Sequence, residues 1–192
     1  MPSELSAKWD AKYINASCAD VSPSAILNNN THLLPPNGTA LDYASGLGGN
    51  ALMLARCGLV THAWDISPIA LEKLKAYSLE QQLKIITEIR DVEIHPPESQ
   101  QFDVIVVTNF LHRPTFVNLI NALRPGGLLF YQTFTLVKVS EQGPSKPKFL
   151  LKKNELLTLC SSLEILVYRE EDKQGDITKG WRNQAMAIAK KP

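Results

Sequence analysis

The chain has 192 residues, 44% of them hydrophobic, and a formal net charge of +1, which is typical of one globular domain. The small charge argues against a nucleic-acid partner, and no apolar run approaches the roughly 18 residues of a membrane span. The N-terminus lacks the apolar core of a signal peptide, and the three cysteines have no metal-ligand spacing. We therefore expect a cytoplasmic protein with reduced thiols and no metal.

Apolar runs typical of buried strands alternate with segments of helical periodicity. In chain order, the predicted elements are a strand at 39–43, a helix at 50–58, a strand at 59–65, a helix at 67–82, strands at 83–89 and 102–110, a helix at 115–123, a strand at 126–134, a helix at 154–160, and strands at 163–170 and 183–191. This alternation predicts an α/β fold, with a mostly parallel sheet of seven strands covered on both faces.

The end of the chain departs from this alternation. About a dozen polar residues without helical periodicity separate the last two strands, so we expect these strands to pair as an antiparallel hairpin. We treat residues 1–192 as a single domain, with a helical cap over 1–38. The irregular stretch 135–153 is predicted to form a flap, because long loops in compact domains often serve function.

The turn that follows the first strand is rich in glycine. It reads GLGGNA over residues 46–51 and leads directly into a helix, an arrangement whose backbone N–H groups suit a cofactor. Dinucleotides and S-adenosylmethionine both use such turns, and in both cases Asp65, at the end of the second strand, can hold ribose hydroxyls. Asp42 separates the two classes, because its carboxylate would repel a pyrophosphate and attract the amino group of S-adenosylmethionine.

With these motifs in place, the sequence resembles the class I S-adenosylmethionine-dependent methyltransferases from about Trp9 to the last strand. LDYASGLGGN resembles the first motif of that family, AWDISPIALEKL the second and IRDVE the third, while FDVIVVTNFLHR and LRPGGLLFYQTF resemble the fourth and fifth. The short length and the GGNALMLARCG stretch are most similar to the small tellurite-resistance and thiol methyltransferase group. The resemblance implies a Rossmann-like methyltransferase fold.

The resemblance also implies a set of residues that bind S-adenosyl-L-methionine: Asp42, Ala44, Gly46, Gly48, Asn50, Asp65, Ile66, Asp91, Val92 and Asn109. Within this set, Asp91 would accept from the adenine amine and the backbone N–H of Val92 would face the adenine. The family usually has glycine where this chain has Ala44, and the extra methyl group would narrow the approach to the methionine moiety.

The segment that follows the fourth strand is predicted to face the acceptor, because ligands in open parallel sheets lie outside the carboxyl ends of the strands. His112 could act as a general base and Arg113 could hold an anionic group; the alternative is that both side chains simply begin the next helix. Trp9 and Tyr13, four residues apart on a helix, are interpreted as core packing, with a lid over the cofactor as the alternative.

These observations predict methyl transfer to a small-molecule acceptor, such as a thiol or a metalloid oxyanion, by a monomer or homodimer without nucleic-acid or membrane partners. Such nucleophiles need no general base. Two alternatives remain: an NAD(P)-dependent oxidoreductase, which GLGGNA alone would fit, and a protein that binds S-adenosylmethionine without catalysis.

Overall fold

The computed structural model describes residues 3–192, so Met1 and Pro2 of the predicted 1–38 cap lie outside the described residues. The rest of that cap holds two α-helices, α1 (Glu4–Tyr13) and α2 (Ala25–Asn28), and two 3₁₀ turns. Ser3 caps α1 through its hydroxyl, which accepts from the Ser6 backbone N–H.

The rest of the chain alternates strands and helices as predicted. In chain order, the elements are β1 (Thr39–Tyr43), α3 (Gly49–Arg56), β2 (Val60–Asp65), α4 (Pro68–Glu80), β3 (Ile85–Ile89), β4 (Phe102–Thr108), α5 (Phe116–Ala122), β5 (Leu123–Phe134), α6 (Glu155–Leu159), β6 (Glu164–Arg169) and β7 (Gln184–Lys190). Ser67 caps α4 and Pro68 occupies its first turn, as their sequence positions indicate.

The seven strands form one sheet in the order β3-β2-β1-β4-β5-β7-β6. β7 is antiparallel to both β5 and β6, and the remaining neighbours are parallel, which confirms the predicted mixed sheet and its C-terminal hairpin. β5 begins three residues before the predicted start, because Leu123 pairs with Phe102 across a register shift in β4.

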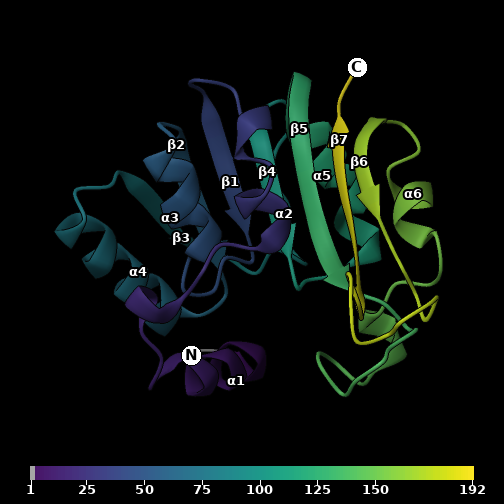
Figure 1. Cartoon of the computed structure of the whole chain (residues 1–192). Helices are drawn as coiled ribbons and strands as arrows, with labels where there is room; N and C mark the ends of the chain where they lie inside the picture. The colour runs from purple at the N-terminus through teal and green to yellow at the C-terminus, as the bar shows by residue number, and fades with distance from the viewer. Residues whose placement is uncertain (1–2) are drawn as a thin grey trace.

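Helices cover both faces of the sheet (Figure 1). Ile105 and Val107 of β4 pack with α5 and α6, whereas Val104 and Val106 pack with α2 and α3. This alternation shows that the continuously apolar strand is buried on both sides. α1 and the loop after β5 both lie beyond the carboxyl ends of the parallel strands (Figure 1). The chain reverses its direction of winding between β1 and β4, so a crevice is expected at this edge.

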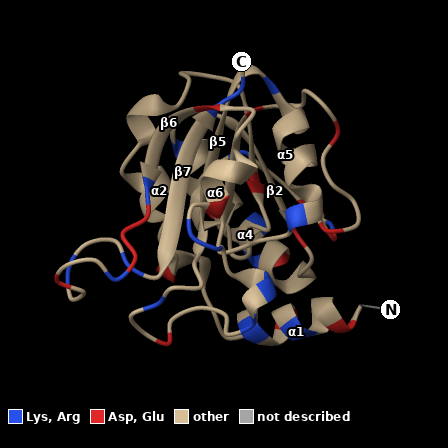
Figure 2. Cartoon of the chain, turned by 90° about the vertical axis from the view of Figure 1, so that its right-hand side faces the viewer, with Lys and Arg blue, Asp and Glu red and all other residues tan. Residues whose placement is uncertain are grey.

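Lysine, arginine and acidic residues are interspersed over the face shown in Figure 2. Within residues 3–192 there is no helix with both the length and the apolar character needed to cross a membrane.

Candidate cofactor and acceptor site

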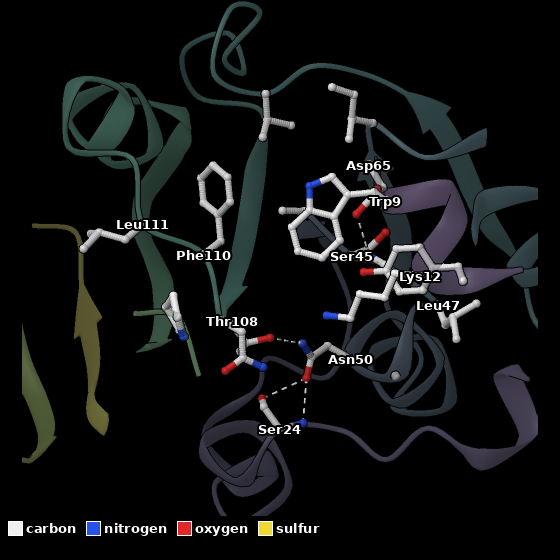
Figure 3. Close-up of a pocket in the computed structure, with 18 of the residues that line it drawn as sticks. Trp9, Lys12, Ser24, Ser45, Leu47, Asn50, Asp65, Thr108, Phe110 and Leu111 are labelled. Carbon is white, nitrogen blue, oxygen red and sulfur yellow. Dashed lines mark hydrogen bonds between the residues drawn. The ribbon is translucent and has the colours of Figure 1, made fainter. Parts of the chain in front are cut away.

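A cavity of about 1000 Å³ lies at the carboxyl ends of the parallel strands. One part, which we call the turn side, comprises residues 44–50, 65–66 and 91–93. The opposite part, the flap side, comprises residues 108–111 with Gln132, Phe134, Gln142, Gly143, Pro144, Phe149 and Gln184. α1 contributes a further stripe of side chains (Figure 3). The predicted flap over 135–153 therefore supplies part of the cavity wall.

The glycines of the turn are required by their backbone and by their neighbours. Gly46 and Gly48 have φ angles of 53° and 75°, in the left-handed region that favours glycine. A Cβ added to Gly48 would lie 2.4 Å from a methyl carbon of Leu74, and one on Gly46 would lie 2.7 Å from the Tyr13 hydroxyl. Ala44 also adopts a left-handed φ of 57° and lines the cavity, which explains why glycine is favoured at this position.

Asp42 lies beneath the turn and does not line the cavity. Its Oδ2 accepts from the Ala51 backbone N–H at 2.9 Å, and its Oδ1 accepts from Asn50 Nδ2 at 3.4 Å. Burial raises the pKa of this carboxyl to about 7, although both hydrogen bonds oppose the shift. The prediction that Asp42 contacts the amino group of the cofactor is corrected: its carboxylate is used to fix the start of α3.

Asn50 connects three segments around the turn and lines the cavity. Its Nδ2 also donates to Thr108 Oγ1 at 3.0 Å, and its Oδ1 accepts from both the backbone N–H and the hydroxyl of Ser24 at 2.8 Å (Figure 3). The predicted residue thus lies at the site, with its amide held by β4 and by the segment before α2.

Asp65 is buried at the end of β2 and lines the turn side, next to Ile66. Its Oδ2 accepts from the Gly46 N–H at 2.7 Å and its Oδ1 accepts from the Ser67 N–H at 2.9 Å. Desolvation raises the pKa of this carboxyl, and these N–H donors oppose the rise. Both oxygens of Asp65 are thus engaged by backbone donors, but each keeps a lone pair for a ligand.

Asp91 and Val92 line the turn side after β3, as their positions predict. Asp91 Oδ1 accepts from the Glu93 backbone N–H at 3.1 Å, and the Val92 carbonyl accepts from the Tyr43 hydroxyl at 2.6 Å. These bonds hold the backbone of the segment against the sheet.

Asn109 lines the flap side at the end of a chain of amides. It adopts a left-handed φ of 55°, and its Oδ1 accepts from Gln184 Nε2 at 3.0 Å. Gln184 Oε1 accepts from Gln132 Nε2 at 3.0 Å, and Gln132 Oε1 accepts from the Ile26 N–H at 2.9 Å. The sequence reading missed both glutamines, because β7 meets β5 only through the antiparallel ending of the sheet.

His112 and Arg113 lie outside the cavity lining, so the prediction that they face the acceptor is corrected. His112 Nδ1 lies 3.1 Å from Thr115 Oγ1, at the start of the helical turn before α5. Arg113 forms two hydrogen bonds with Glu155, at 2.6 and 2.8 Å, and donates to the carbonyls of Lys148 and Leu150. Arg113 therefore ties the flap to α6.

The interpretation of Trp9 and Tyr13 as core packing holds only for Tyr13, which is partly buried against the core cluster that includes Leu47 and Leu74. The rings of Trp9 and Tyr13 are stacked at 6.0 Å and both line the cavity, as the lid alternative required. Leu5, Lys8 and Lys12 share this lining face of α1. Their spacing along the helix would have shown that Leu5, Lys8, Trp9 and Lys12 share one face, but the lysines make that face resemble a solvated surface.

The two sides of the cavity differ in charge. The turn side carries three carboxylates, those of Asp65, Asp91 and Glu93. The flap side consists of aromatic, aliphatic, amide, hydroxyl, proline and glycine residues, and none of its described side chains is ionisable near neutral pH. No group of three or more potential metal-ligating side chains occurs within residues 3–192.

Comparisons with known proteins bear on this site. Residues 40–127 match the family described as "Methyltransferase domain". A ubiquinone biosynthesis O-methyltransferase of Coxiella burnetii is 33% identical over 98 residues, which are 48% of this chain and 42% of the relative. The chain thus spans less than half the length of the curated relatives that it matches.

Two solved structures share the fold. TehB from Haemophilus influenzae superposes with a TM-score of 0.71 at 20% identity, covering 97% of this chain and 67% of TehB. The second structure is described as "Conversion of a Disulfide Bond into a Thioacetal Group during Echinomycin Biosynthesis". It superposes with a TM-score of 0.72 at 18% identity, covering 98% of this chain and 92% of that protein. The family match over residues 40–127 agrees with the resemblance that the sequence motifs indicate, and the two structures show that the fold is shared.

Proposed function

We propose that this chain is a class I S-adenosylmethionine-dependent methyltransferase and that it transfers a methyl group to a small-molecule thiol. The observation that carries the proposal is the contrast across the cavity. A turn side with carboxylates and glycines faces a flap side whose described residues include no acid or base. A soft nucleophile is the acceptor that such a surface can serve.

The described residues suit the cofactor. The Ser45 hydroxyl is buried at the cavity and has no hydrogen-bond partner within residues 3–192, so a polar group of a ligand would satisfy it. Asp65 would hold the ribose hydroxyls, Asp91 and Val92 would bind the adenine, and Ile66 would pack against it. Asn109, which lines the flap side, would offer its amide to the cofactor or the acceptor.

When bound, S-adenosylmethionine would supply a sulfonium methyl group that a nucleophile attacks in line, with S-adenosylhomocysteine as the leaving group. The residues of this chain would contribute orientation and exclusion of water, which can lower a barrier by about 7–11 kcal/mol in the best cases. A thiol needs no enzymatic base, because with a pKa near 8.5 a few per cent of it is already thiolate at pH 7. Its proton would pass to solvent.

The flap side also favours a thiol over a metalloid oxyanion. Phe110, Phe134 and Phe149 offer apolar surface, and no lysine or arginine lies among the flap-side residues to bind a small anion. We therefore expect the sulfur to be carried on an apolar body. The echinomycin-pathway structure, whose description concerns sulfur chemistry, supports this choice by fold alone.

The test is turnover of the full chain with S-adenosylmethionine and a panel of thiophenol, a catechol, tellurite and selenite, with formation of S-adenosylhomocysteine and methylated product measured together. We expect equimolar thioether and S-adenosylhomocysteine from the thiol. Faster methylation of the catechol or of an oxyanion would overturn the thiol assignment. Binding of the cofactor without turnover of any acceptor would support the non-catalytic alternative.

A further inference from the structure

α1 is fixed across the glycine turn by polar contacts with α4. The Ser6 hydroxyl donates to the Ile66 carbonyl at 3.1 Å. Asp10 Oδ1 accepts from the Ser67 hydroxyl at 2.5 Å and from the Ile69 N–H at 3.3 Å. Lys73 of α4 donates to the carbonyls of residues 13, 14 and 16, just where α1 ends. One face of α1 is thus anchored, which directs a neighbouring face into the cavity.

Lys12 is the cation that this arrangement brings to the turn. Its Nζ lies 4.7 Å from the ring centroid of Trp9 and 6.0 Å from that of Tyr13. The Tyr13 hydroxyl in turn borders Gly46, because a Cβ built on that glycine would lie 2.7 Å from it. Figure 3 shows the Trp9 and Lys12 side chains projecting into the cavity, with the lysine directed toward Asn50 and Thr108.

The charge of Lys12 is not matched by any protein carboxylate within residues 3–192, since none lies within ion-pair distance of its Nζ. Contact with aromatic rings stabilises an exposed ammonium only weakly. The lysine therefore remains able to bind an anion that enters the cavity.

S-adenosylmethionine carries one anionic group, the carboxylate of its methionine moiety. The carboxylates of the turn side repel that group, and the lysines of α1 are the cations that line the cavity among the described residues. Of these lysines, Lys12 directly precedes Tyr13, the residue whose hydroxyl borders Gly46. We infer that Lys12 binds the carboxylate of the cofactor and that α1 thereby clamps the methionine end against the glycine turn. This inference rests on the proposed function and adds a binding residue to it.

The test compares two ligands that differ only in that carboxylate: S-adenosylmethionine and decarboxylated S-adenosylmethionine. Calorimetric affinities are measured for the parent and for Lys12→Met. We expect Lys12→Met to lower the affinity for S-adenosylmethionine about tenfold or more and to change the affinity for the decarboxylated ligand less than twofold. Lys12→Arg should restore most of the affinity, because it restores the charge. Lys75→Met, an equal loss of charge at an exposed position of α4, should bind both ligands like the parent.

An equal loss of affinity for both ligands in Lys12→Met would show that Lys12 packs α1 and would overturn the inference. No loss of affinity for either ligand would also overturn it. In both cases a parent that binds and uses S-adenosylmethionine leaves the proposed function standing. A parent that binds neither ligand would contradict both proposals. A parent that binds the cofactor without turning over any acceptor would contradict the proposed function alone, while the ligand comparison still decides the role of Lys12.

Discussion

The two sides of the cavity are built in different ways. On the turn side, Asp42 bonds to residues eight and nine positions away, and Asp65 bonds to Gly46 and Ser67, so one strand-turn-helix segment and the next strand supply the contacts. Behind the flap side, outside the cavity lining, Arg113 donates to Glu155, and Asn183 accepts from the Val139 N–H at 2.7 Å and donates to Ser140. The carboxylates of Asp42 and Asp65 are therefore fixed by neighbouring segments, whereas the flap depends on segments that are distant in sequence. Asn50 of the turn side shares that dependence, because it is held by Ser24 and Thr108.

The largest effect should come from crowding the turn. Gly48→Ala must accommodate both a left-handed φ of 75° and a Cβ 2.4 Å from Leu74, whereas Gly126→Ala has a similar φ of 78° with no atom within 4 Å of the added Cβ. We expect Gly126→Ala to lower the free energy of unfolding by about 1–2 kcal/mol and Gly48→Ala by about 1–3 kcal/mol more. Gly48→Ala should also lower the affinity for S-adenosylhomocysteine, measured by calorimetry, at least about 100-fold. An equal loss of unfolding free energy in the two variants would show that the turn is not sterically constrained.

Removing the carboxylate at the end of β2 should have the next largest effect. Asp65→Ala should lower the affinity for S-adenosylhomocysteine by about 10- to 100-fold, which corresponds to roughly 1.5–3 kcal/mol for hydrogen bonds to a charged group. Because the substitution also removes acceptors from Gly46 and Ser67, thermal unfolding should be measured alongside calorimetry. A folded variant with parental affinity would limit Asp65 to shaping the turn.

On the flap side, Arg113→Ala should separate acceptor binding from cofactor binding. Loss of the bonds to Glu155, Lys148 and Leu150 releases the flap, so we expect the KM for the acceptor to rise about tenfold while the Kd for S-adenosylhomocysteine stays within twofold. Arg113→Lys should leave the KM for the acceptor almost as high, because an ammonium cannot reproduce the bidentate pair with Glu155. A large change in cofactor affinity would contradict the independence of the two sides.

Asp42 should have the smallest effect on ligand binding, because it does not line the cavity, and should act instead through the pH dependence of stability. Its pKa in the folded chain is raised to about 7 from an ordinary 3.8, so its contribution to stability is complete below pH 3.8 and is lost as the pH rises through 7. Relative to Asp42→Asn, the parent should lose up to about 1.4 kcal/mol of unfolding free energy per pH unit in that window.

Urea denaturation at several pH values from 5 to 8 measures this difference. Asp20→Asn, at an exposed position, serves as the control. Parallel stability profiles for the parent and Asp42→Asn would show that Asp42 does not titrate in this range.

The sequence predicted the order of the elements and the turn side well, because strand periodicity, glycine spacing and the Ser67 cap are properties of short segments. It placed Asn50, Asp65 and Asp91 at the cavity for the same reason. It misplaced Asp42, His112 and Arg113, because the direction of those side chains depends on their partners Ala51, Thr115 and Glu155. No local pattern showed that α1 anchors on α4 and turns Trp9 toward the cavity.

The central claim is that the turn side binds S-adenosylmethionine or its demethylated product. Calorimetric titration of the full chain with S-adenosylhomocysteine, and separately with NAD⁺, tests it most directly. We predict saturable binding of one S-adenosylhomocysteine per chain, loss of that binding in Gly48→Ala, and no binding of NAD⁺. Binding of NAD⁺ in preference to S-adenosylhomocysteine, or binding of S-adenosylhomocysteine that Gly48→Ala leaves intact, would contradict the account.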